Sequence, residues 1–178
     1  MVPVKMRERC LRWPVAVVVT ALFIAGCAPS ETAKSNLFDL ADVEIGDPVA
    51  GLKVVDIRAQ TADGTPDPTD ATVVFEGQVT VTGTVVHHPE DDAFLGNLIC
   101  MMELDEASER KLPRMRGDQR DVWFCFNNTE EARRALLAQP GTGRATVVID
   151  DYTIQHRPTE VWNSATLVRV VSFDWTRP

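Results

Sequence analysis

The chain has 178 residues, a length that suits one domain of about 100–150 residues with appendages. Its formal net charge is −8. Residues 1–26 hold four basic residues against one acidic residue, so the remainder carries 14 basic and 25 acidic residues, a net charge of −11. Because affinity for nucleic acid comes largely from cations that neutralise phosphates, this charge disfavours a nucleic-acid partner.

The first 27 residues form a targeting segment. A basic start precedes an apolar run over residues 15–25, which is too short to span a membrane comfortably, since spanning takes ~20 residues. The run ends in Ile24-Ala25-Gly26-Cys27, which resembles the lipobox of bacterial lipoproteins. The resemblance implies a signal peptide at 1–26, cleavage before Cys27, and acyl chains such as palmitate that hold the protein on a membrane. The alternative is an ordinary signal peptide with an incidental cysteine.

Residues 27–50 are expected to be the lipidated N-terminus and a linker, and residues 51–178 the folded domain. The early linker is small and polar, as a flexible tether is. Apolar residues within 37–40 predict a short helix or a flap on the domain. Ala28, rather than aspartate, follows the lipobox; in Gram-negative lipoproteins this accompanies passage to the outer membrane. The expected location is the cell envelope, facing outside the cytoplasm.

The longest regular pattern runs from Val73 to Val86. Valine and phenylalanine alternate there with polar residues, the period of a strand with one buried face and one solvated face. Gly77 and Gly83 share the register of the valines and predict bends or bulges. The abundance of β-branched residues argues against a helix.

Shorter patterns predict the remaining elements of a mostly β domain. Further strands are expected at 52–57, 98–104, 122–126, 145–149 and 161–173, with a loop at 63–68. One helix is expected between the third and fourth strands of the series that starts at Val73. Asn128 would cap it, and Gln139-Pro140-Gly141 would end it.

This order of elements is that of a five-stranded OB-fold barrel, in which one helix closes an end. The run from Val73 to Phe173 resembles the OB-fold bacterial lipoproteins of the tRNA-anti-like family. The likeness rests on residues 75–85, 122–127 and 145–150. The family name refers to anticodon-binding relatives, but a fold does not carry its function with it.

Cys100 and Cys125 lie in predicted neighbouring strands. Disulfides persist outside the cytoplasm, and cross-strand distances suit a bridge. The alternatives are buried free thiols, or a redox or metal site. The spacing is unlike C-x-x-C, and no histidine accompanies either cysteine, so a structural disulfide is predicted.

A metal site is one reading of His87 and His88, with Asp91 and Asp92 close behind them and a Met101-Met102 pair further along. Adjacent residues on a strand point to opposite faces, so the two histidines would not readily share an ion. The commoner reading is a solvated strand end followed by an acidic turn. The sequence therefore predicts no metal, and no cofactor.

Two sets of residues are candidate ligand contacts. The polar excursion at 105–121 carries the basic residues Arg110, Lys111, Arg114, Arg116 and Arg120, which could recognise an anionic partner or could pair with the chain's own carboxylates. The aromatic residues Trp123, Tyr152 and Trp162 could line the exposed face of the fold or could pack in its core.

Enzyme motifs are absent from the sequence: it has no nucleophile elbow, phosphate loop or zinc-ligand pattern. We therefore expect a non-catalytic, lipid-anchored module that binds a protein or an envelope polymer through the face of strands 2 and 3 and the 105–121 excursion. One alternative is an enzyme, or an enzyme accessory, acting on envelope sugar or peptide. Another is a metal-handling lipoprotein, which would lose its metal on His87→Ala.

Overall fold

A computed structural model describes residues 35–59, 69–136, 141–157 and 161–175. The predicted signal peptide, Cys27 and the predicted loop at 63–68 lie outside these ranges. Among the residues described, no helix has both the length and the apolar character that crossing a membrane requires.

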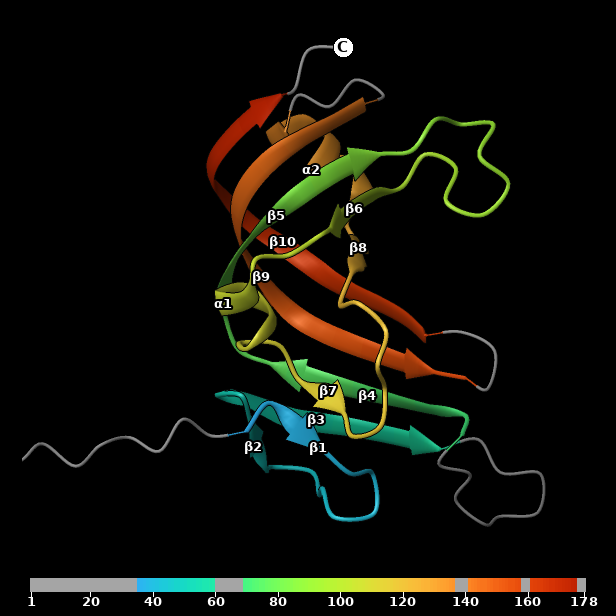
Figure 1. Ribbon diagram of the computed structural model, residues 1–178, viewed down its shortest axis with the longest axis vertical. Helices are drawn as coiled ribbons and strands as arrows, with labels where there is room; N and C mark the ends of the chain where they lie inside the picture. Colours follow the sequence, from blue (N-terminus) through green and yellow to red (C-terminus); the bar gives the residue numbers. More distant parts are fainter. Residues whose placement is uncertain (1–34, 60–68, 137–140, 158–160, 176–178) are drawn as a thin grey trace, which may run out of the picture. The chain divides into compact units, whose positions relative to one another are not determined.

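The described residues are mostly strand, with two short helices (Figure 1). The elements are β1 (Leu37–Phe38), β2 (Pro48–Val49), β3 (Leu52–Ala59), β4 (Ala71–Glu76), β5 (Val79–His87), β6 (Ile99–Met102), α1 (Glu106–Glu109), β7 (Arg114–Met115), β8 (Phe124–Phe126), α2 (Thr129–Leu136), β9 (Gly141–His156) and β10 (Val161–Trp175). The mostly β class predicted from the sequence is confirmed.

The main sheet closes into a ring. Its strand order is β10-β8-β6-β5-β9-β4-β3-β2, and β10 also pairs with β9. Five strands, β9, β5, β6, β8 and β10, therefore form a closed circuit of hydrogen-bonded neighbours (Figure 1). Within that circuit β8 runs parallel to β10, whereas the other four pairings are antiparallel.

The long predicted strand is present but divided at Gly77-Gln78. Gly77 has a φ of +127°, a conformation that favours glycine, and its amide donates to Asp150 Oδ1 at 2.9 Å. Both halves pair with the same strand, β9. Strand β4, before the break, pairs with residues 152–156 of β9, and β5, after it, pairs with residues 141–149. The predicted bend at Gly77 thus lets one stretch of sequence follow a long, curved partner strand.

The valine side of that stretch faces the core, as predicted. Val73, Phe75, Val81 and Val85 each have no exposed surface. Gly83 lies in the same register, where a Cβ atom would come within 2.8 Å of the Met102 carbonyl oxygen. The second glycine therefore permits a close backbone approach next to β6.

The other predicted elements occur with shifted ends. The strands expected at 52–57, 98–104, 122–126, 145–149 and 161–173 are β3, β6, β8, β9 and β10. Helix α2 lies between β8 and β9 in the chain, as expected, and buries Ala132 and Leu136. Asn128, just before α2, uses its side chain on β10: Oδ1 accepts from the Leu167 amide at 2.9 Å, and Nδ2 donates to the Leu167 carbonyl at 3.0 Å.

The predicted linker contributes to the folded domain from residue 36 onward. Phe38 and Val49 belong to the hydrophobic core, and the Phe38 ring lies 5.5 Å from that of Phe75 in an edge-to-face contact. Residues 37–40 begin with strand β1, which pairs in parallel with β7 of the 105–121 excursion. The flap expected there is present as a strand rather than a helix.

Candidate ligand-binding groove

The 105–121 excursion is fixed to the ring by helix α1. Asp105 caps α1 by accepting from the Ser108 amide at 2.8 Å. The Ser108 hydroxyl accepts from the Thr82 amide at 2.8 Å, and the Asp105 amide donates to the Thr82 carbonyl at 3.0 Å. These bonds satisfy the backbone amide and carbonyl of Thr82 on β5, which lie beyond the part of β5, Thr84–His87, that pairs with β6. The excursion is therefore an ordered part of the domain.

The segment after α1 is held by the N-terminal strand. The amide of Arg114 donates to the Asn36 carbonyl at 2.8 Å, and the amide of Arg116 donates to the Phe38 carbonyl at 2.7 Å. The Asn36 side chain in turn donates to the carbonyls of Glu109 and Leu112, at 3.2 and 3.1 Å. From this clamp the chain returns through residues 120–123 to β8.

An open groove of about 890 Å³ lies between this returning segment and the solvent-facing side of β5 and β6. Its lining consists of Thr84, Val86, Met102, Glu103, Leu104, Glu109, Arg120, Asp121, Val122, Trp123 and Thr142. Thr84 and Val86 alternate with the fully buried Val85, so they lie on the opposite face of β5 from the core. The groove thus lies over β5 and β6, which come from the predicted strands at 73–86 and 98–104, and beside residues 122–123 at the start of the predicted third strand.

The groove combines apolar and acidic groups. Trp123 is half-buried and meets Trp162 edge to face, with ring centroids 5.6 Å apart. Glu103 is exposed and accepts a hydrogen bond from the Thr84 hydroxyl at 3.0 Å. Such a surface can hold an extended ligand by apolar contact and by hydrogen bonds to carboxylates.

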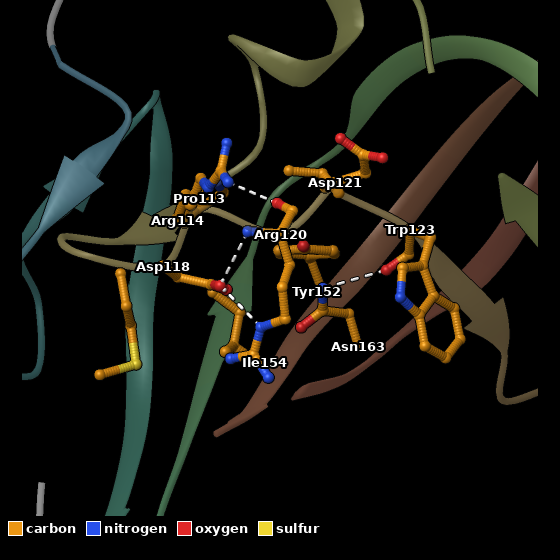
Figure 2. Close-up of a pocket in the computed structure, with 11 residues that line it drawn as sticks. Pro113, Arg114, Asp118, Arg120, Asp121, Trp123, Tyr152, Ile154 and Asn163 are labelled. Atoms are coloured by element: carbon orange, nitrogen blue, oxygen red, sulfur yellow. Dashed lines mark hydrogen bonds and ion pairs between the residues drawn. The ribbon is translucent and has the colours of Figure 1, made fainter. Parts of the chain in front are cut away.

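A second, much smaller cavity lies behind the returning segment (Figure 2). Its volume of about 20 Å³ leaves room for about one water molecule. Asn163, from β10, is 6% exposed, and its Nδ2 donates to the Trp123 carbonyl at 3.0 Å. Its Oδ1 has no protein partner. Residues 120–123 line both this cavity and the groove.

Two titratable groups of the cavity are perturbed. Burial alone would raise the pKa of Asp118, but hydrogen bonds from Arg120 and the nearby guanidinium groups of Arg120 and Arg114 outweigh it, so the pKa is lowered. Burial raises the pKa of the Tyr152 phenol, the Asp118 carboxylate raises it further, and Arg114 opposes both. Asp118 is therefore held ionised and Tyr152 neutral at pH 7.

Each of the five predicted ligand-loop cations is engaged with a neighbouring group. The pairs are Arg110 with Glu106, Lys111 Nζ with the Thr80 carbonyl at 3.0 Å, Arg114 with the Arg120 carbonyl, Arg116 with Asp39 at 2.6 Å, and Arg120 with Asp118 at 2.8 Å. This is the arrangement expected of a loop that pairs with the chain's own groups. Only Arg120 among them lines the groove.

The three predicted ligand-face aromatic residues separate into two roles. Tyr152 is 1% exposed, and its ring lies 6.3 Å from Phe75 and 6.1 Å from Phe124. It therefore packs in the core, which was the second of the two positions predicted for these aromatic residues. Trp123 lines the groove, while Trp162 supports it from the side.

Cys100 and Cys125 form a disulfide. They are register partners on β6 and β8 and are 0% and 2% exposed. The bridge joins two neighbouring strands of the ring two residues before Met102, which lines the groove.

The two histidines lie apart, as expected for adjacent residues of a strand. His87 is 6% exposed, so the strand ends in a buried histidine and the expectation of a solvated strand end was wrong there. The His88 Nδ1 atom lies 3.2 Å from Asp92 Oδ2. Amides of Leu95 and Phe94 donate to Asp92 and, with His88, lower its pKa against a smaller effect of burial. The acidic turn is thus closed by Asp92. Within the described ranges, no three histidine, cysteine or acidic residues are grouped so as to hold a metal ion.

Several groove and cavity residues were not identified from the sequence. Glu103, Glu109, Asp121 and Asn163 come from four separate segments, and no spacing pattern connects them. They meet because α1 folds back on β5 and the chain returns beside β6. No protein-family model, curated protein or solved structure matches the chain.

Proposed function

We propose that this chain is a lipid-anchored, non-catalytic binding module of the bacterial cell envelope, built on an OB-fold, whose groove takes a protein or an envelope polymer. The observation that carries the proposal is the groove itself: it lies over β5 and β6 and is walled by Trp123. Concave surfaces with aromatic and apolar linings and a few polar groups are typical binding sites.

The strand order supports the OB-fold part of the proposal and the tRNA-anti-like family. An OB-fold is a five-stranded Greek-key barrel whose exposed face binds oligomeric ligands. The circuit of five strands, the parallel β8–β10 pairing and the position of α2 between β8 and β9 are consistent with it. The acidic balance of the chain argues against nucleic acid as the ligand.

The contrast between the two concave sites favours binding over catalysis. The cavity that holds the perturbed Asp118 and Tyr152 has room for about one water molecule, too little for a sugar or a peptide. The groove is large enough for either, but neither Asp118 nor Tyr152 lines it. This perturbed pair and the substrate-sized space, which an active site needs together, are thus in different places.

The envelope location rests on Cys27 and is supported by the disulfide, because disulfides persist outside the cytoplasm. We expect Cys27→Ala to release the protein from membranes and to abolish labelling by a clickable palmitate analogue. Continued membrane association of the variant would contradict acyl anchoring. In a Gram-negative cell, the proposed destination is the outer membrane.

The binding role is tested by photocrosslinking in intact cells. A photoreactive residue at Met102, in the groove, should yield a defined crosslinked partner that the same residue at Arg134 does not. Arg134 lies on α2, with a side chain 73% exposed, and serves as the matched surface control. Identical products from both positions, or none from Met102, would contradict the proposed site.

A further inference from the structure

The groove carries negative charge that the rest of the described chain does not neutralise. Its lining includes Glu103, Glu109 and Asp121, and among the described residues none of these three forms an ion pair. Arg120 is the one cation among the lining residues that the structure describes, and it is paired with Asp118, which lies in the cavity rather than the groove. The groove therefore presents three uncompensated carboxylates around one neutralised guanidinium.

Two other described cations lie outside the groove lining. Arg144, the neighbour of Thr84 on β9, lies 4.0 Å from Asp105. Arg114 keeps its charge, since it donates to the neutral Arg120 carbonyl, but it lines the cavity and not the groove. An anionic polymer would therefore meet repulsion here, whereas a cationic ligand would be attracted.

The floor between the carboxylates is apolar. Val86, Met102 and Trp123 are partly exposed in the groove, and Leu104 and Val122 lie buried beneath it. An indole is also the preferred aromatic partner for a lysine or arginine side chain. The lining thus offers contacts both for apolar side chains and for cations.

The backbone of β6 is not available to a ligand. It pairs with β5 on one side and with β8 on the other, so a chain lying over it cannot add to the sheet as a new strand. The occupant must be recognised through its side chains. We infer that it is a cationic segment of a protein partner, in which lysine or arginine residues are spaced by apolar ones; this rests on the proposed function.

The test is binding of a short labelled peptide of alternating lysine and leucine to the full chain in a non-ionic detergent, followed by fluorescence anisotropy. A glutamate–leucine peptide and a chito-oligosaccharide serve as competing probes. We expect the lysine peptide to bind, more weakly as salt rises, and the glutamate peptide not to bind. Glu103→Gln with Glu109→Gln should weaken the lysine peptide about fivefold.

A charge-matched control separates the groove from general attraction to an acidic protein. Glu90→Gln with Asp91→Asn removes the same number of charges from the exposed turn at 88–98. At physiological salt, which screens distant exposed charges, this pair should change the affinity for the lysine peptide by less than about 1.5-fold. Equal weakening by both pairs, or no binding of the lysine peptide, would overturn the inference. Binding of the oligosaccharide alone would also overturn it, yet leave the proposed function standing. The proposed function fails if Met102 crosslinks to nothing or gives the same products as Arg134.

Discussion

The ring and the 105–121 excursion are held together by different means. The ring is joined by continuous strand pairing around an interior in which Val81, Val85 and Ile149 have no exposed surface. The excursion has one four-residue helix and a two-residue strand. It is fixed by hydrogen bonds from Asn36, Asp105 and Ser108 and by one fully buried apolar side chain, Leu112.

The difference separates stability from recognition. Apolar burial is the dominant favourable term in folding, and it is concentrated in the ring. Individual hydrogen bonds contribute about 1 kcal/mol each, so the excursion is expected to open more easily than the ring. The groove lies where the two regions meet. Its floor is strand β6 of the ring, and its wall is the segment that returns from the excursion, so substitutions can loosen the wall without loosening the floor.

The largest expected effect comes from the hydrophobic core of the main sheet. Phe75→Ala should lower the free energy of unfolding by about 4 kcal/mol, because a fully buried phenylalanine is replaced by a cavity. Phe94→Ala makes the same chemical change at a residue that is 89% exposed, and should shift stability by less than about 0.5 kcal/mol. Urea denaturation measures both, and similar losses would contradict the assigned core.

The disulfide ranks next. Its partners are separated by 25 positions, and on the chain-entropy model closing a loop of this length stabilises by roughly 3 kcal/mol. Cys100→Ala with Cys125→Ala should lose about that amount in urea denaturation. Mass spectrometry of the exported protein provides the complementary check, since two free thiols would contradict the bridge.

The strands could be predicted because their signals are local. Period-2 alternation identified the buried face of Val73–Val86 and Gly77 the break, whereas Gly83, also expected at a bend or bulge, lies within unbroken pairing to β9. The alternation is imposed by the pleat itself, so a strand's buried face can be read without knowing its neighbours. The cysteines were predicted to pair because their strands were expected to be neighbours outside the cytoplasm.

The candidate site could be predicted only by region. The 105–121 excursion and Trp123 were identified, but the groove's carboxylates were not, because they come together through long-range contacts. Residue 36, for example, is bonded to the backbone at 109 and 112, although composition places residue 36 in a tether. A polar segment folded by hydrogen bonds to distant backbone groups has the same composition as a solvated loop.

The clamp at Asn36 allows the excursion to be loosened without the ring. Asn36→Ala removes two hydrogen bonds to carbonyl groups, worth about 1 kcal/mol each. We expect roughly thirtyfold faster hydrogen exchange across 105–121, with β5 and β9 unchanged. Ser35→Ala, which removes an exposed bond to the Leu37 amide, is the control. Equal acceleration in the ring would show that the two regions unfold as one.

The smallest expected effect concerns pH and Asp118. Its pKa is lower in the folded protein than in the unfolded chain, because Arg120 and Arg114 outweigh the effect of burial. Asp118 therefore adds stability above its unfolded pKa of about 3.9, and that stability is lost as pH falls through the folded value. At pH 7 the wild-type protein should have a higher free energy of unfolding than Asp118→Asn. The difference between the two free energies should become smaller below about pH 4.

Comparing the two proteins at each pH isolates this group. Asp92 and Asp105 also have lowered pKa values, but they are present in both proteins and cancel in the difference. Urea midpoints at neutral and acid pH give the measurement, with Asp42→Asn on the exposed surface as control. If the difference in urea midpoint between wild type and Asp118→Asn stays constant or widens in acid, the Asp118–Arg120 ion pair does not stabilise the segment that forms the groove wall.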